Sequence, residues 1–255
     1  MPFMRASILL ATTLAVTTAC TESPTGRRQF ILMDEGQTQQ LGAQAFREVL
    51  AEHPVSRDRS LNARVDTVAR RIAAAAGVDP DDCEVRVIED ETPNAFAMPG
   101  CKIGVHTGLF KVVENDAQLA AVLGHEMAHV TVRHAEERMS RDMLLNAALV
   151  VGGIAAGQDN AQLVQVAAAA ATLGIVLPFT RDQEAEADAV GLRYMARAAY
   201  DPNEAVEVWK NFERLGDDRG PQFLSTHPSP GNRIAELEKL VPEVMGTYRE
   251  ARARR

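Results

Sequence analysis

The sequence lacks an excess of basic residues and contains few cysteines, and each shortage excludes a class of protein. It has 27 lysines and arginines against 35 aspartates and glutamates, which gives a formal charge of −8. Domains that bind nucleic acids usually carry a basic face, so no nucleic-acid partner is expected. Three cysteines are too few for a small scaffold held together by disulfides. A charged fraction of 24% also excludes a wholly disordered chain.

The sequence does contain enough apolar residues for a substantial core. They make up 46% of its 255 residues, and a typical domain needs about 100–200 residues. We therefore expect a polar tether over 20–28, one domain over 29–245 and a basic tail over 246–255.

The N-terminus, residues 1–19, has the composition of an export signal. Its apolar run over 6–16 is too short to span a bilayer. Ala19 before Cys20 resembles the bacterial lipobox, in which the cysteine is lipidated, although Thr17 stands where lipoboxes usually have leucine. The alternative is an ordinary secretory signal with an incidental cysteine. We expect an exported protein in a bacterial periplasm, anchored to the outer membrane through a lipid on Cys20.

Export changes the expectation for the other two cysteines, because disulfides persist outside the cytosol. Cys83 opens one expected strand and Cys101 precedes another. We expect a disulfide between Cys83 and Cys101, and two separate thiols are the alternative.

The spacing of apolar residues predicts a mostly helical domain with one small sheet. Apolar residues recur at helical intervals in some segments and alternate in short runs typical of strands in others. The expected helices cover about 35–53, 61–76, 116–134, 181–198, a segment from Asp201-Pro202 onward, and 232–240; the expected strands cover 84–89 and 95–106, the second interrupted at Pro99-Gly100.

Two apolar segments, 143–157 and 161–179, follow the third helix. No residue from Asn160 to Thr180 is charged, which is nearly the length of a membrane span. Polar residues within both segments favour a buried or partner-facing helical hairpin, and membrane insertion is the alternative.

The motif that carries chemistry is His125-Glu126-Met127-Ala128-His129. Residues four apart on a helix differ by about 40° around its axis, so both imidazoles project from one face and can hold one zinc ion. Glu126 is turned about 100° from His125, which places it beside the metal, where a general base stands. A polar helix surface is the alternative, but apolar residues surround the motif, and buried histidines need a partner.

A catalytic zinc ion needs a third protein ligand and one open position. His134 follows His129 by five residues, about 140° round the helix, so we expect it to face away and to have a structural or supporting role. Glu184 and Asp188 share a face of a predicted helix, so one can bind the metal and the other can hold a ligand histidine. Glu186 points elsewhere, as in a solvated acidic turn.

These residues resemble the HtpX-like and CAAX prenyl protease-type zinc metallopeptidases, which are gluzincins. The resemblance implies a zincin-like metallopeptidase domain of α+β class, mostly α, with a small sheet packed on the HExxH helix. It implies one zinc ion per chain on His125, His129 and Glu184, with Glu126 as catalytic base and Asp188 supporting a ligand. The segments that carry it are 94–100, 107–109, 181–188, 199–202 and 225–230, with Arg233.

The resemblance also implies a substrate strand. Substrate backbone would pair with its edge, which selects extended or unfolded chains, and Pro99 limits self-pairing at that edge. An exported, lipidated chain looks most like the periplasmic branch that includes the β-barrel assembly-enhancing protease, although the C-terminal helical repeats of that type are not expected here. The residues of the strand are Asn94, Ala95, Phe96, Ala97 and Met98.

The expected activity is therefore zinc-dependent hydrolysis of unfolded or misassembled envelope polypeptides. A zinc-containing chaperone or scaffold lipoprotein and a structural lipoprotein without metal are the alternatives. Glu126 counts against a purely structural zinc site, which has no need of a base. For His227 three roles are open: it stabilises the oxyanion, it occupies the open zinc position and keeps the enzyme latent, or it is a turn histidine beside Pro228.

Overall fold

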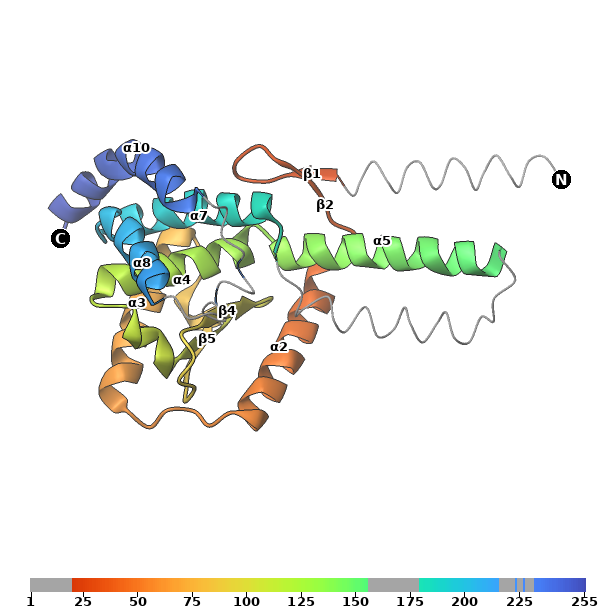
Figure 1. Ribbon diagram of the computed structural model, residues 1–255, viewed down its shortest axis with the longest axis horizontal. Helices are drawn as coiled ribbons and strands as arrows, with labels where there is room; N and C mark the ends of the chain where they lie inside the picture. The colour runs from red at the N-terminus through yellow and green to blue at the C-terminus, as the bar shows by residue number, and fades with distance from the viewer. Residues whose placement is uncertain (1–19, 156–178, 216–222, 224–226, 228–231) are drawn as a thin grey trace. The chain divides into compact units, whose positions relative to one another are not determined.

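The computed structural model of the protein describes residues 20–155, 179–215, 223, 227 and 232–255 (Figure 1). The chain divides into two compact units, residues 1–35 with 135–175 and residues 36–134 with 176–255. The expected α+β class with a predominance of helix is confirmed. The expected signal peptide over 1–19 lies outside the described residues.

The smaller unit contains a hairpin where a polar tether was expected. Its elements are β1 (Cys20–Glu22), β2 (Arg28–Phe30) and α5 (His134–Ala155). Strands β1 and β2 pair in antiparallel fashion. The turn between them forms because Gly26 adopts a φ of 84° and the Ser23 hydroxyl accepts the Arg27 backbone N–H. Arg27 in turn donates two hydrogen bonds of 2.7 Å to Glu137 of α5, which holds the hairpin in this unit.

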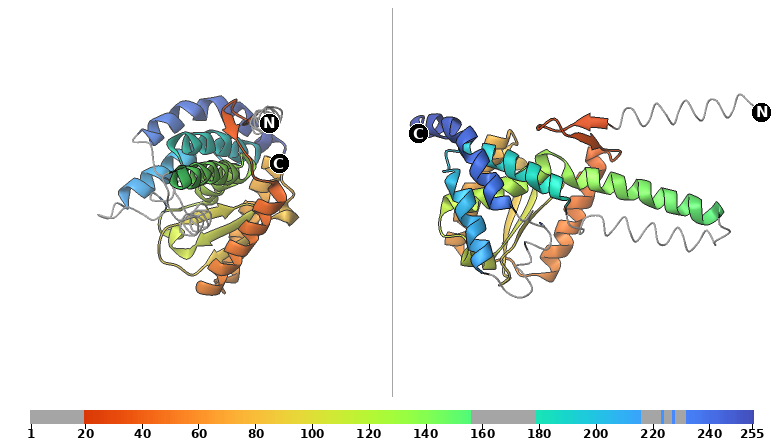
Figure 2. Two further views of the ribbon diagram at one scale, coloured as in Figure 1. Left: turned by 90° about the vertical axis from the view of Figure 1, so that its right-hand side faces the viewer. Right: turned by 45° about the horizontal axis from the view of Figure 1, so that its top comes forward.

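The larger unit is built from helices around a three-stranded sheet (Figures 1 and 2). Its helices and strands are α2 (Glu35–Glu52), α3 (Arg59–Ala76), β3 (Glu84–Ile88), β4 (Ala95–Met98), β5 (Lys102–His106), α4 (Asp116–Thr131), α7 (Arg181–Arg197), α8 (Asn203–Arg214) and α10 (Arg233–Ala253), with short 3₁₀ turns over Pro80–Asp82 and Thr107–Lys111.

The two faces of the sheet pack against different helices. The strand order is β3-β5-β4, with β3 parallel and β4 antiparallel to β5. Side chains alternate along a strand, so Ala95 and its partner Val105 face the core formed with α3 and α4. Phe96 faces the opposite way, lies over Gly104 and packs edge-on against Phe46 of α2. The sheet therefore positions β4 between α2 and the motif helix.

Helix α4 lies at the centre of this unit and contacts α3, α7, α8 and β4. It begins as its sequence predicts, because Asn115 caps it by accepting the backbone N–H groups of Ala117 and Gln118. It ends earlier than expected, at Thr131 rather than near His134, because Arg133 adopts the left-handed conformation with a φ of 61° and breaks the helix.

The last helix is longer than the expected 232–240. Val241, Val244 and Tyr248 are buried and continue the apolar spacing past that point. The helix therefore continues through Ala253 and includes most of the segment expected as a basic tail, 246–255.

The apolar segments expected as a helical hairpin lie only partly within the described residues. Helix α5 contains the first of them as far as Ala155, and Met143, Leu144 and Leu145 are exposed on it. The second, 161–179, lies outside the described residues except for Phe179. Within the part of the chain that is described, no helix combines the length and apolarity that crossing a membrane requires.

Candidate metal centre

Helix α4 presents His125 and His129 side by side in the interior of the larger unit. The two side chains are one turn apart and are buried, and their Nε2 atoms lie 3.1 Å apart. Two such nitrogens converge on one point, as the helical spacing predicts. Glu126, also buried, lies next to them.

Helix α7 brings the carboxylate of Glu184 to the same point. Its Oε2 is 3.3 Å from Nε2 of His125, and its Oε1 is 3.4 Å from Nε2 of His129. The helix begins with a capping box formed by Thr180 and Gln183, which fixes Glu184 in the first turn.

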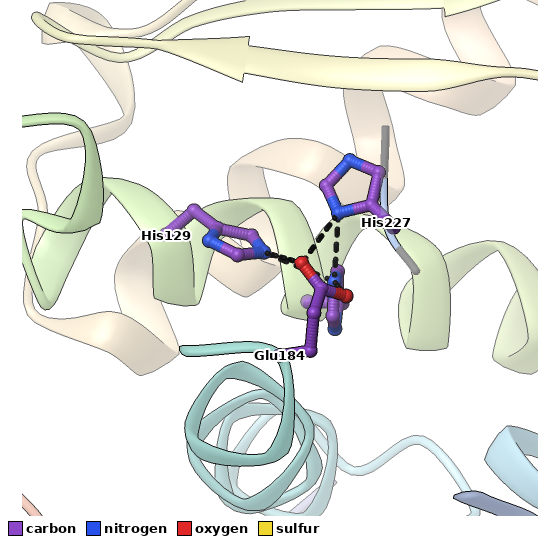
Figure 3. A group of neighbouring side chains, drawn as sticks. His129, Glu184 and His227 are labelled. Atoms are coloured by element: carbon purple, nitrogen blue, oxygen red, sulfur yellow. Dashed lines mark hydrogen bonds and ion pairs between the residues drawn. The ribbon is translucent and has the colours of Figure 1, made fainter. Parts of the chain in front are cut away.

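His227 completes the cluster from a distant part of the chain. Its Nδ1 lies 3.1 Å from Oε1 of Glu184 and 3.3 Å from Nε2 of His125. Figure 3 shows His129, Glu184 and His227 pointing toward one another. One donor atom from each of His125, His129, Glu184 and His227 lies within 4.8 Å of the others.

These separations fit a zinc ion. Zinc binds nitrogen and oxygen ligands at about 2.0–2.1 Å in tetrahedral geometry, which sets the donors about 3.3 Å apart. Five separations between donor atoms of the cluster are 3.1 to 3.4 Å, and the four donors all lie within 4.8 Å of one another. Three nitrogens and one carboxylate oxygen are also the ligand types that zinc accepts. The chemistry and the spacing of the donors therefore agree.

Asp188, one turn after Glu184 on α7, supports a histidine of the cluster. Its Oδ1 lies 2.9 Å from Nδ1 of His125 and accepts a hydrogen bond of 2.5 Å from Arg233. Arg233 also donates to Glu184 at 3.3 Å, and its guanidinium lies 3.4 Å from the centre of the Trp209 ring. Arg233 was placed in a late segment of the sequence without a role, and the structure places it between the two carboxylates.

The helix break at Arg133 brings two further residues to the cluster. Nδ1 of His134 lies 2.9 Å from Nδ1 of His129, and its Nε2 lies 3.2 Å from Oε2 of Glu186. Glu186 is buried, so the expectation of a solvated acidic turn is wrong. The sequence pattern hid this contact because an unbroken helix would carry His134 away from His129.

Glu126 has an unusual protonation equilibrium. Burial raises its pKa to about 7 from 4.5, and the neighbouring His227 acts in the opposite direction. Its Oε1 makes no hydrogen bond within the described structure and lies 3.4 Å from Nε2 of His227. Burial also acts to raise the pKa of Glu184, but the charges of His227 and His125 hold it well below its usual value. The two carboxyl groups therefore differ in proton affinity, as a base and a metal ligand must.

Strand β4 lies beside Glu126. The backbone N–H of Ala97 in this strand acts to lower the pKa of the Glu126 carboxyl group. Of the expected substrate strand, Ala95, Phe96, Ala97 and Met98 form β4, whereas Asn94 precedes it and its carbonyl accepts the backbone N–H of His106. Among the described strands β4 pairs with β5 alone.

The three cysteines form one disulfide pair and one free thiol. Cys83 and Cys101 are joined by a disulfide, with their Cα atoms 4.7 Å apart next to strands β3 and β5. Cys20 is exposed at the start of β1 and has a free thiol. Lipidation of Cys20 stays a prediction.

Comparison with known proteins gives a consistent set of similarities. The sequence model of peptidase family M48 matches residues 59–241. The mitochondrial metalloendopeptidase OMA1 of Schizosaccharomyces pombe is 34% identical over 225 residues, which cover 85% of this chain and 65% of that protein. The OMA1 of Arabidopsis thaliana is 36% identical over 185 residues, 72% of this chain and 37% of that protein.

A bacterial protein is also similar. The beta-barrel assembly-enhancing protease of Escherichia coli K12 is 30% identical over 212 residues, which cover 79% of this chain and 43% of that protein. The chain thus spans less than two thirds of the length of each of these relatives.

These similarities contradict the expected location, a bacterial periplasm with a lipid anchor in the outer membrane. The relatives from two yeasts and Arabidopsis thaliana are named mitochondrial metalloendopeptidases, which points to a mitochondrial location instead. The prediction rested on a short apolar run after a single arginine, and such a composition does not specify a compartment.

Proposed function

Because the chain belongs to peptidase family M48, whose members use zinc, we propose that it is a zinc-dependent endopeptidase acting on unfolded or misassembled polypeptides. The observation that carries this proposal is the buried cluster of zinc-type donors with Glu126 beside it. A structural zinc site has no use for a buried carboxylate that neither binds the ion nor supports one of its ligands.

In this proposal His125, His129 and Glu184 hold the ion. Zinc, when bound, polarises the substrate carbonyl and makes a water molecule more acidic. Glu126 takes a proton from that water on its carboxylate and later delivers it to the leaving amine. In the metal-free protein the pKa of Glu126 is about 7 because of burial, and the charge of a bound zinc ion would favour the ionised carboxylate that accepts the proton.

The substrate binds in extended form along β4. This strand lies beside Glu126, and its backbone can add a further strand through main-chain hydrogen bonds. Such pairing needs an unfolded stretch of several residues, which supports a role in protein quality control. Pro99 directly after the strand limits pairing between copies of the enzyme.

The alternative, a zinc-containing chaperone or scaffold with little or no proteolysis, gives a different result in one experiment. Glu126→Gln keeps the shape of the side chain and removes the base, so we expect zinc content to stay at one per chain while casein cleavage falls by at least about 100-fold. Glu207→Gln, an exposed glutamate on α8, is the matched control and should cleave like the wild type. Undiminished cleavage by Glu126→Gln overturns the mechanism, and no cleavage by the wild type favours the chaperone.

His227 occupies the fourth donor position in the described geometry, which supports its role as a gate rather than as an oxyanion donor. We expect His227→Ala to open that position to water and to raise the initial rate of casein cleavage several-fold. A lower rate supports oxyanion stabilisation. An unchanged rate excludes both roles and leaves a turn histidine.

A further inference from the structure

We propose that His134 and Glu186 form a hydrogen-bonded relay that orients His129 and fixes which of its ring nitrogens faces the metal. This inference rests on the proposed metal site and adds two positioning residues to it. Glu186 contacts His134, and His134 contacts His129, so in this proposal both residues act through His129.

The backbone at the end of α4 makes the relay possible. The left-handed conformation of Arg133 ends α4 and starts α5 at His134. The chain therefore turns back toward His129. The ring of His134 is fully buried, and its centre lies 4.9 Å from the centre of the His129 ring. The side-chain amide of Gln183 in α7 donates to the backbone carbonyl of His134 at 3.3 Å and ties this turn to α7.

The two nitrogens of His129 have separate partners. Its Nε2 faces His125 and Glu184 in the donor cluster, at 3.1 and 3.4 Å. Its Nδ1, on the other side of the ring, lies 2.9 Å from Nδ1 of His134. His134 is thus on the wrong side of His129 to bind the same ion.

The positions of the protons follow from this arrangement. A histidine that binds zinc through Nε2 carries its proton on Nδ1, so Nδ1 of His129 donates and Nδ1 of His134 accepts. The proton of a neutral His134 then lies on Nε2, 3.2 Å from the Glu186 carboxylate, which accepts it. Every group in the chain from Glu186 to His129 has the partner that its protonation requires.

The relay explains why α7 carries three carboxylates near the site. Glu184 lies in the donor cluster, Asp188 contacts Nδ1 of His125 directly, and Glu186 reaches His129 through His134. Both motif histidines are therefore supported by a carboxylate, one directly and one through a second imidazole. Such support fixes the ring and raises the basicity of the ligand nitrogen.

The test compares zinc affinity in the full-length protein. Glu186→Gln removes the charge at constant shape, and His134→Phe removes both nitrogens while it keeps a buried ring. Controls are Glu204→Gln, which alters a glutamate that accepts from two side-chain amides away from the metal, and His106→Phe, which alters another buried histidine. Competition with a chromogenic chelator measures zinc affinity, and circular dichroism of the metal-free proteins checks folding.

We expect zinc binding to weaken by about 10- to 100-fold in Glu186→Gln and His134→Phe and by less than about 2-fold in both controls. The double variant should bind zinc like His134→Phe alone, because Glu186 acts through His134. If His134→Phe does not fold, Glu186→Gln decides the outcome by itself. Wild-type affinity in Glu186→Gln overturns the relay.

Nitrogen-15 NMR of labelled histidines gives a readout that a purely structural role would not change. In the zinc-loaded wild type we expect His134 with a bare Nδ1 and a protonated Nε2. Glu186→Gln should shift or broaden these signals, while Glu204→Gln leaves them in place. A protonated Nδ1 on His134 in the wild type also overturns the relay. A wild type that binds no zinc at all refutes the proposed function instead.

Discussion

At the scale of single residues, burial strongly disfavours the ionised form of the Glu126 side chain. A buried carboxylate without a full set of hydrogen bonds is costly in its ionised form, so its proton affinity rises. This burial therefore reduces the stability of the protein, and under the proposed function it also prepares Glu126 to act as a base.

The raised pKa of Glu126 predicts that the stability of the metal-free protein depends on pH. The pKa of Glu126 is about 7 in the folded state against 4.5 for an ordinary glutamate, so the folded state binds more protons between these values. The free energy of unfolding then falls as pH rises through this window. The free energy of unfolding of Glu126→Gln should exceed that of the wild type by about 3 kcal/mol at pH 8 and by less than about 1 kcal/mol at pH 5.

Urea unfolding of chelator-treated protein at the two pH values measures the difference. Glu207→Gln, which alters an exposed side chain, should follow the wild type at both. An equal advantage of Glu126→Gln at pH 5 and pH 8 would show that the carboxyl group titrates normally.

The sequence was sufficient to predict most members of the donor cluster and the support from Asp188, but not the contacts of Arg233, His134 and Glu186. His125, His129 and Glu184 follow from helical spacing together with the family resemblance, and the structure brings them together. The contact of His134 with Glu186 depends on the left-handed backbone conformation of Arg133. Arginine rarely adopts this conformation, so the local sequence does not predict the contact. The assignment of His125, His129 and Glu184 as zinc ligands stays a proposal.

At the scale of elements, the crossing of α4 and α7 decides whether the donors meet. Gly124 and Gly191 face each other where the helices cross, and a Cβ on Gly191 would lie 2.8 Å from the backbone carbon of Gly124. Only two glycines allow the helices to approach this closely.

We therefore expect Gly191→Ala to push α7 away from α4, lower the free energy of unfolding by about 1–3 kcal/mol and weaken zinc binding. Gly246→Ala is the matched control, because it lies within α10 with no atom near the added methyl group. Its free energy of unfolding should rise by about 0.5–1 kcal/mol, because alanine has a higher helix propensity than glycine, and its zinc binding should be unchanged. Chemical denaturation and chelator competition measure both effects; similar results for the two variants would contradict tight packing at the crossing.

The elements themselves were predicted best where capping and periodicity agree. Helix α3 has apolar residues at helical intervals, an Asp58 cap and Gly77 in the left-handed conformation after its end, and its bounds were close to those expected. The hairpin of β1 and β2 was missed because its short strands carry no alternating apolar pattern and depend on contacts with α5. The length of α10 was missed because Pro242 and Gly246 suggested an end that tertiary burial overrides.

At the scale of the whole molecule, the disulfide between Cys83 and Cys101 closes a loop with a sequence separation of 18. A cross-link of this length restricts the unfolded chain and stabilises the folded protein by roughly 3 kcal/mol. The double variant Cys83→Ala, Cys101→Ala should therefore unfold at a lower denaturant concentration.

The exposed Cys20 provides the control, since Cys20→Ala should unfold like the wild type. Treatment of the wild type with a reductant should reproduce the behaviour of the double variant. If oxidised wild type and double variant unfold together, the disulfide contributes nothing to stability.

Membership of peptidase family M48 confirms the prediction at the level of the family. The HtpX-like and CAAX prenyl protease-type branch stays a prediction, because the relatives include OMA1 proteins and a beta-barrel assembly-enhancing protease. Catalytic motifs identify a family well because chemistry fixes their spacing. Location was predicted wrongly because targeting segments follow composition rather than geometry.

The way the donor cluster is assembled from the chain also determines when the metal site can form. His125 and His227 lie 102 positions apart in sequence, and Glu184 lies between them on a separate helix. No fragment emerging early during synthesis contains all the donors, and an unfolded copy cannot hold them together. Under the proposed function, the protein therefore could not cleave its neighbours, or its own nascent chain, before it has folded.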